Sequence, residues 1–314
     1  MPGAFNAEPA EDGAILMYPE GDRSAPASGR MPAGGYYFDA IIRQPPIVEG
    51  RLGVEDNLEE FKPLSADDLE ATRTQVSELF TGTSLAIVAS SLSTSFGDIA
   101  LVPAPFLKRP KGIRDVEEWY VSTVTRRAFV REIFARQCDI GIGNLERIHA
   151  VVGDRVEVLF VTGADFGTQR GLFISPDTYR DLYKPFHKRV NDWVHAHTAW
   201  RTFIHSCGGV EPFIGDFVEA GFDILNPVQC SAEGMDPAHL KRTYGERITF
   251  WGGGIDTQRT LPFGTPGQVR EEVKRRVEIF ADGDGFVFNA IHDIQANTPV
   301  ENMMAMFEAF DECR

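Results

Sequence analysis

Six short apolar runs alternate with helical segments beyond residue 84, and this alternation constrains the fold more than any other feature of the sequence. The runs are Leu85–Ser91, Val156–Gly163, Trp200–Cys207, Asp223–Val228, Ile248–Gly254 and Phe286–His292. The segments between and after them have helical periodicity: Val116–Ala135, Pro176–His197, Val210–Ala220, Pro237–Tyr244, Pro266–Ala281 and Pro299–Asp311. Continuous apolar runs separated by helices are typical of a mostly parallel sheet that is buried on both faces. The sequence therefore predicts an α/β fold.

Glycine spacing favours a barrel over an open nucleotide-binding sheet. Gly252–Gly254 follows a strand but lacks the G-x-G-x-x-G spacing, and no phosphate-binding G-x-x-x-x-G-K-[ST] loop occurs. We therefore predict a TIM (β/α)8 barrel. If the last run is the eighth strand, Leu85–Ser91 is the third, and the first two strands are missing or irregular.

The predicted domains divide at residue 84. Residues 1–84 are rich in glycine and proline, which predicts an irregular region of hairpins and loops. Its one predicted helix, Ser65–Phe80, begins with a capping box in which Asp68 follows Ser65 by three residues. Residues 85–314 should then supply barrel strands three to eight.

Composition excludes several classes of protein. The chain has 31 Lys and Arg against 46 Asp and Glu, a formal charge of −15, which argues against nucleic-acid binding. No apolar run is long enough to span a bilayer, and Met1–Asp12 lacks the order of a signal peptide, so we expect a cytoplasmic protein. Its four cysteines are too scattered for a disulfide framework and should be free thiols or metal ligands.

Polar residues follow the predicted strands, where barrel enzymes carry their chemistry. His205 and Cys207 are two residues apart on one strand, so an imidazole nitrogen and a sulfur face the same side and could bind one zinc ion. His292 or Cys230 could be the third ligand, and three protein ligands are typical of catalytic zinc. The alternative is a packed histidine beside a buried thiol.

Asp165 and Gln169 follow another predicted strand. Asp165 could be a general base, a substrate anchor or a loop residue that accepts hydrogen bonds from backbone amides. The remaining strand ends carry further polar residues: Asn226, Gln229, Asp256, Gln258 and Asp293.

Taken together, seven motifs resemble the uroporphyrinogen decarboxylase superfamily, most strongly from Val156 onward. They are Asp165–Gln169, Ile174–Pro176, His205–Gly208, Asp223–Gln229, Met235–Pro237, Gly252–Gln258 and Thr298–Asn302. The resemblance implies a TIM barrel and one of two activities: cofactor-free decarboxylation of porphyrinogens, or zinc-dependent methyl transfer between corrinoid proteins and thiols. The His-x-Cys motif is similar to that of the methyltransferase branch, whose third ligand, a cysteine, corresponds here to His292.

Three hypotheses follow from this resemblance. The first is a methyltransferase with zinc at His205, Cys207 and His292, and with a corrinoid protein and a small methyl donor or acceptor as partners. In it, Asp165 and Gln169 are the catalytic residues, and the substrate-binding residues are Asn226, Gln229, Asp256 and Gln258. The second is decarboxylation of uroporphyrinogen or a related carboxylate, as in porphyrin biosynthesis. The third is a non-catalytic fragment; an open barrel would expose strand edges, which favours a homo-oligomer.

Overall fold

The computed structural model describes residues 6–313 and divides into two compact units. The N-terminal unit runs to Ala164 and resumes at Thr178–Trp200; the C-terminal unit comprises Asp165–Asp177 and the chain from Arg201 onward. The predicted division at residue 84 lies inside the N-terminal unit. Among the helices of residues 6–313, none combines the length and apolar character that a membrane span requires.

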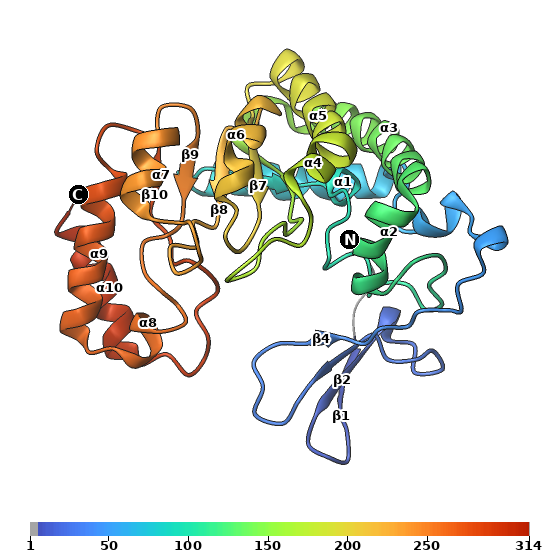
Figure 1. Ribbon diagram of the computed structural model, residues 1–314, viewed down its shortest axis with the longest axis horizontal. Helices are drawn as coiled ribbons and strands as arrows, with labels where there is room; N and C mark the ends of the chain where they lie inside the picture. Colours follow the sequence, from blue (N-terminus) through green and yellow to red (C-terminus); the bar gives the residue numbers. More distant parts are fainter. Residues whose placement is uncertain (1–5, 314) are drawn as a thin grey trace. The chain divides into compact units, whose positions relative to one another are not determined.

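The N-terminal unit begins with a small antiparallel sheet in which successive strands are neighbours, as Figure 1 shows for the blue strands. Its strands are β1 (Asn6–Pro9), β2 (Ile15–Tyr18), β3 (Gly29–Met31) and β4 (Asp39–Ala40). These are the short hairpins expected from the glycine and proline content. Within residues 6–84, all described strands belong to this antiparallel sheet, so none of them supplies a parallel barrel strand.

The first helix, α1 (Ala66–Gly82), confirms the predicted capping box. The Ser65 hydroxyl accepts a hydrogen bond from the Asp68 amide at 3.1 Å, and the Ser65 amide donates to the Asp68 carboxylate at 3.0 Å. These bonds satisfy amide groups that have no partner within the helix.

The rest of the N-terminal unit is a parallel strand pair with long helices. Strand β5 (Val88–Ser90) pairs with β6 (Val158–Thr162). The helices are α2 (Val116–Thr125), α3 (Arg127–Val152) and α5 (Lys184–His197), and a π-helical turn (Tyr179–Tyr183) leads into α5. The short helix α4 (Pro176–Thr178) contains the point in the chain where the C-terminal unit's segment ends and the N-terminal unit resumes.

The prediction of one helix over Val116–Ala135 is wrong in two respects. The helix breaks at Arg126, and α3 continues to Val152. Gly141 lies inside this helix and packs closely on another segment: a Cβ there would lie 2.9 Å from the Ser93 carbonyl oxygen. Tertiary contact thus overrides the low helix propensity of glycine.

His187 of α5 lies in an aromatic core of the N-terminal unit and is fully buried. Its ring centroid is 5.7 Å from that of Phe96, and its Nδ1 is 3.1 Å from the Tyr179 hydroxyl. His187 is therefore a packing residue. Burial lowers the pKa of His187 to about 3.

We expect His187 to make the N-terminal unit acid-sensitive. The unfolded chain takes up a proton at this ring below about pH 6.5, whereas the folded chain does not. The contribution of neutral His187 is therefore fully present above that pH and is lost as the pH falls toward 3. Urea unfolding at pH 7 and pH 5 should show a smaller pH-dependent loss of stability for His187→Phe than for the parent. Equal losses would contradict this account.

The C-terminal unit is a four-stranded parallel sheet whose strands follow chain order. Its strands are β7 (Arg201–His205), β8 (Ile224–Asn226), β9 (Thr249–Trp251) and β10 (Phe286–Val287). Its helices are α6 (Glu211–Glu219), α7 (Pro237–Tyr244), α8 (Thr260–Phe263), α9 (Pro266–Phe280) and α10 (Val300–Asp311). The six predicted strands thus occur as β5–β10, which confirms a parallel α/β fold.

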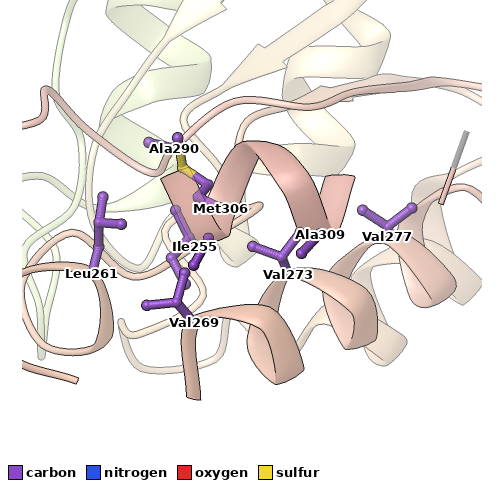
Figure 2. Packing of buried hydrophobic residues seen from close by; sticks show 9 residues of the cluster. Ile255, Leu261, Val269, Val273, Val277, Ala290, Met306 and Ala309 are labelled. Atoms are coloured by element: carbon purple, nitrogen blue, oxygen red, sulfur yellow. The ribbon is translucent and has the colours of Figure 1, made fainter. Parts of the chain in front are cut away.

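One core of the C-terminal unit forms between α9 and α10. Figure 2 shows Val269 and Val273 of α9 close to Met306 and Ala309 of α10, and all four side chains are buried. They recur at helical spacing, which is why each helix presents an apolar stripe. This packing fixes the last helix near the chain segment that follows β10.

Candidate metal centre

His205 and Cys207 lie together at the carboxyl end of β7. The Cys207 sulfur is 3.4 Å from His205 Nε2, so both donor atoms face one side of the chain, as their spacing predicts. The Ser206 side chain points elsewhere: its hydroxyl accepts a hydrogen bond from the Phe166 amide at 3.0 Å. The strand end therefore presents its imidazole and its thiol as a pair.

Two glycines allow the strand end to approach the loop that follows Asp165. Gly208 has φ +89°, and a Cβ there would lie 2.3 Å from the Gly167 carbonyl carbon. The Gly209 amide donates to the Thr168 carbonyl oxygen at 2.9 Å. Only glycine fits such a backbone approach, which explains the Gly-Gly pair after Cys207.

Asp165 completes a group of three potential ligands. Its carboxylate accepts a hydrogen bond from the Cys207 amide at 2.6 Å. One ligand atom from each of Asp165, His205 and Cys207 lies within 4.8 Å of the others. The sequence singled out Asp165 as catalytic and did not mark it as a ligand, because 40 residues separate it from His205 and no spacing rule connects them.

Burial makes the anionic forms of Cys207 and Asp165 unfavourable. Burial, followed by the negative charge of Asp165, raises the pKa of the Cys207 thiol to about 12. Burial also raises the pKa of the Asp165 carboxyl, while the Cys207 amide and His205 act in the opposite direction. A divalent cation would stabilise both anions, so binding it would release protons.

A cavity of about 460 Å³ adjoins His205. It is lined by His205, Asn226 and residues 289–294. His292 therefore lies on the wall of the cavity that His205 also lines. Among the described residues, the three-ligand group contains neither His292 nor Cys230.

Cys230 occupies different surroundings. Its sulfur lies 3.3 Å from the Val228 carbonyl oxygen and 4.0 Å from that of Gly253. Burial raises the pKa of this thiol to about 12 as well. Cys230 is thus a buried thiol that contacts backbone carbonyls.

The remaining predicted site residues hold the strand-end loops. Gln229 accepts a hydrogen bond from the Gly208 amide at 2.7 Å, and Asp256 accepts one from the Gln258 amide at 2.7 Å. The side chains of Gln169 and Gln258 are joined by a hydrogen bond of 2.6 Å.

Asn226 contacts His205, with its Oδ1 2.7 Å from Nδ1 of the ring. The register of the parallel strands brings these two residues together, because His205 and Asn226 are partners across β7 and β8.

These features define an α/β protein with parallel strands and a cluster of potential metal ligands at the carboxyl end of a strand, the end at which TIM-barrel enzymes carry their active sites. Residues 145–313 match the family described as "Uroporphyrinogen decarboxylase (URO-D)", and the chain belongs to this family. The predicted resemblance is thereby confirmed.

Relatives of two activities match parts of the chain. The methylcobamide:CoM methyltransferase MtaA of Methanosarcina barkeri is 28% identical over 143 residues, which cover 44% of this chain and 38% of the relative. The uroporphyrinogen decarboxylase of Psychromonas ingrahamii is 31% identical over 87 residues, covering 26% and 24%. The chain thus matches well under half of either relative's length, and the methyltransferase match is the longer one.

A solved structure supports the fold. A methyltransferase from Methanosarcina mazei has a TM-score of 0.56 to this chain at 18% identity, covering 88% of this chain and 72% of the other. The predicted fold class is therefore confirmed as a parallel α/β fold that fits a TIM barrel.

Proposed function

We propose that this protein is a zinc-dependent methyltransferase that moves a methyl group between a corrinoid protein and a thiol or similar small acceptor. The group of Asp165, His205 and Cys207 at the end of β7 carries the proposal. The match to a relative named as a methylcobamide:CoM methyltransferase supports it.

The donor set fits zinc. An imidazole nitrogen and a thiolate sulfur are the ligands that zinc prefers, and a carboxylate is an accepted third ligand. His205 Nε2 and Cys207 Sγ already lie 3.4 Å apart without a metal. Zinc bound here would lower the pKa of a thiol or water in its open position and create a nucleophile near neutral pH.

The third ligand in this proposal is Asp165, because its carboxylate lies with the other two donors. His292 remains the ligand expected from the family resemblance, and it lines the cavity beside His205. Cys230 is the least favoured, since its sulfur contacts backbone carbonyls.

The surrounding residues would bind and orient the acceptor. A small molecule in the cavity beside His205 would lie next to the donor cluster. The linked amides of Gln169 and Gln258 offer hydrogen bonds to its polar groups. Gln229 and Asp256 would act by holding the loops that carry these groups.

The partner in this proposal is a separate protein that carries the corrinoid, and the setting is the cytoplasm. The net charge of −15 supports a partner other than nucleic acid. Completion of an eight-stranded barrel is also part of the proposal. This part of the proposal requires two further parallel strands, because the described strands of residues 6–84 form an antiparallel sheet.

Decarboxylation is the second candidate, supported by the matches to uroporphyrinogen decarboxylases. Such a reaction needs cationic groups to hold several carboxylates. The residues around the cavity, all within the described chain, include neither lysine nor arginine. A cavity lined by these residues, without cationic side chains, therefore favours methyl transfer over decarboxylation.

Methyl transfer from free methylcobalamin to a simple thiol tests the proposal. We expect demethylation of the cobalamin by zinc-loaded protein and almost none by chelator-treated protein, with recovery when zinc is restored. Equal rates with and without zinc would contradict the metal-dependent reaction. Turnover of uroporphyrinogen by metal-free protein would favour the second candidate.

A further inference from the structure

The Asn226 side chain connects the ends of three neighbouring strands. His205 ends β7, Asn226 ends β8 and Trp251 ends β9. Asn226 Oδ1 lies 2.7 Å from His205 Nδ1, and its Nδ2 donates to the Trp251 carbonyl oxygen at 2.9 Å. Asn226 is only 9% exposed, so water competes little for these bonds.

The Trp251 carbonyl determines which way the amide points. A carbonyl oxygen only accepts hydrogen bonds, so the NH₂ group of Asn226 must face it. The reverse orientation would place two acceptor oxygens 2.9 Å apart. Asn226 Oδ1 therefore faces His205.

The orientation of Asn226 fixes the proton on His205. Because Oδ1 can only accept, Nδ1 of the neutral ring must carry the hydrogen. The lone pair then lies on Nε2, the nitrogen that is 3.4 Å from the Cys207 sulfur. Metal-ligating histidines commonly have such a partner on the other ring nitrogen, which sets the tautomer and the orientation of the ring.

We infer that Asn226 is a positioning residue that holds His205 as the Nδ1–H tautomer and so directs Nε2 toward the donor cluster. This role differs from the substrate binding that the sequence predicts for Asn226. The tautomer follows from the hydrogen bonds alone, whereas its use in binding zinc rests on the proposed function.

Nitrogen NMR of the histidine rings in metal-free protein tests whether Asn226 holds His205 as the Nδ1–H tautomer. His205 is assigned as the ring signal absent from His205→Gln. We expect Nδ1–H in the parent but a mixture of tautomers in Asn226→Leu. The control is Thr202→Val, which removes a buried hydrogen bond to the Gly221 carbonyl at the other end of β7. It should leave the His205 signal unchanged.

Zinc affinity, measured by competition with a chelator, tests whether this orientation of His205 supports zinc binding. Loss of such a histidine partner typically weakens metal binding about 10–100-fold, and we expect this for Asn226→Leu. Thr202→Val should bind like the parent. Nδ1–H retained in Asn226→Leu, or Nε2–H in the parent, would overturn the inference. If the tautomer shifts as expected but no form binds zinc, the positioning role stands and the zinc site of the proposed function fails.

Discussion

Cys207→Ala protein is expected to bind zinc at least about 100-fold more weakly than the parent, because losing a ligand should cost more than losing an outer hydrogen-bond partner. The thiol is one of three donors within 4.8 Å of one another, and the remaining imidazole and carboxylate make a poorer zinc site. Zinc content by mass spectrometry, on protein purified without chelators, should fall from about one per chain to near zero. Transfer of methyl groups should fall with it.

Cys230→Ala is the matched control for this loss. Cys230 is also a buried thiol in the C-terminal unit, but its sulfur contacts carbonyls of Val228 and Gly253. The Cys230→Ala protein should keep its zinc. A full complement of zinc in Cys207→Ala, or loss in Cys230→Ala with Cys207 intact, would contradict the assignment of ligands.

Arg114→Ala is expected to reduce the free energy of unfolding by about 3–5 kcal/mol, the cost of leaving a buried partner charge uncompensated. The Arg114 side chain is 1% exposed and its guanidinium pairs with Glu60 at 2.6 Å. It also donates to the carbonyl oxygens of Asp56 and Lys111. One side chain thus ties residues 56–60 to residues 111–114.

Urea unfolding followed by tryptophan fluorescence measures this loss. Arg73→Ala is a control, because Arg73 forms an exposed pair with Glu70 and should change stability far less. Replacing both partners, as in Arg114→Met with Glu60→Leu, should restore much of the loss by removing the unpaired carboxylate. A loss for Arg114→Ala no larger than that for Arg73→Ala would contradict this role.

The sequence determined the elements that depend on local chemistry. The capping box of Ser65 and Asp68 predicts the start of α1 because both hydrogen bonds join residues three positions apart. Apolar runs predict β5–β10 because a strand buried on both faces needs apolar side chains on both; β6 and β8 are buried in this way, whereas β5 is largely exposed. Two-residue spacing predicts that His205 and Cys207 share a side, since side chains alternate along a strand.

Which distant residues join His205 and Cys207 depends on how the chain packs in three dimensions. Asp165 meets Cys207 because two glycine-rich loops pack backbone to backbone, and Asn226 meets His205 because β7 and β8 pair in one register. The close approach of Gly141 in α3 to Ser93 likewise joins residues far apart in the sequence. Local patterns define strands and helices because their hydrogen bonds are short-range. Metal ligands and their partners come from separate strands, so their distances exist only once the chain has packed.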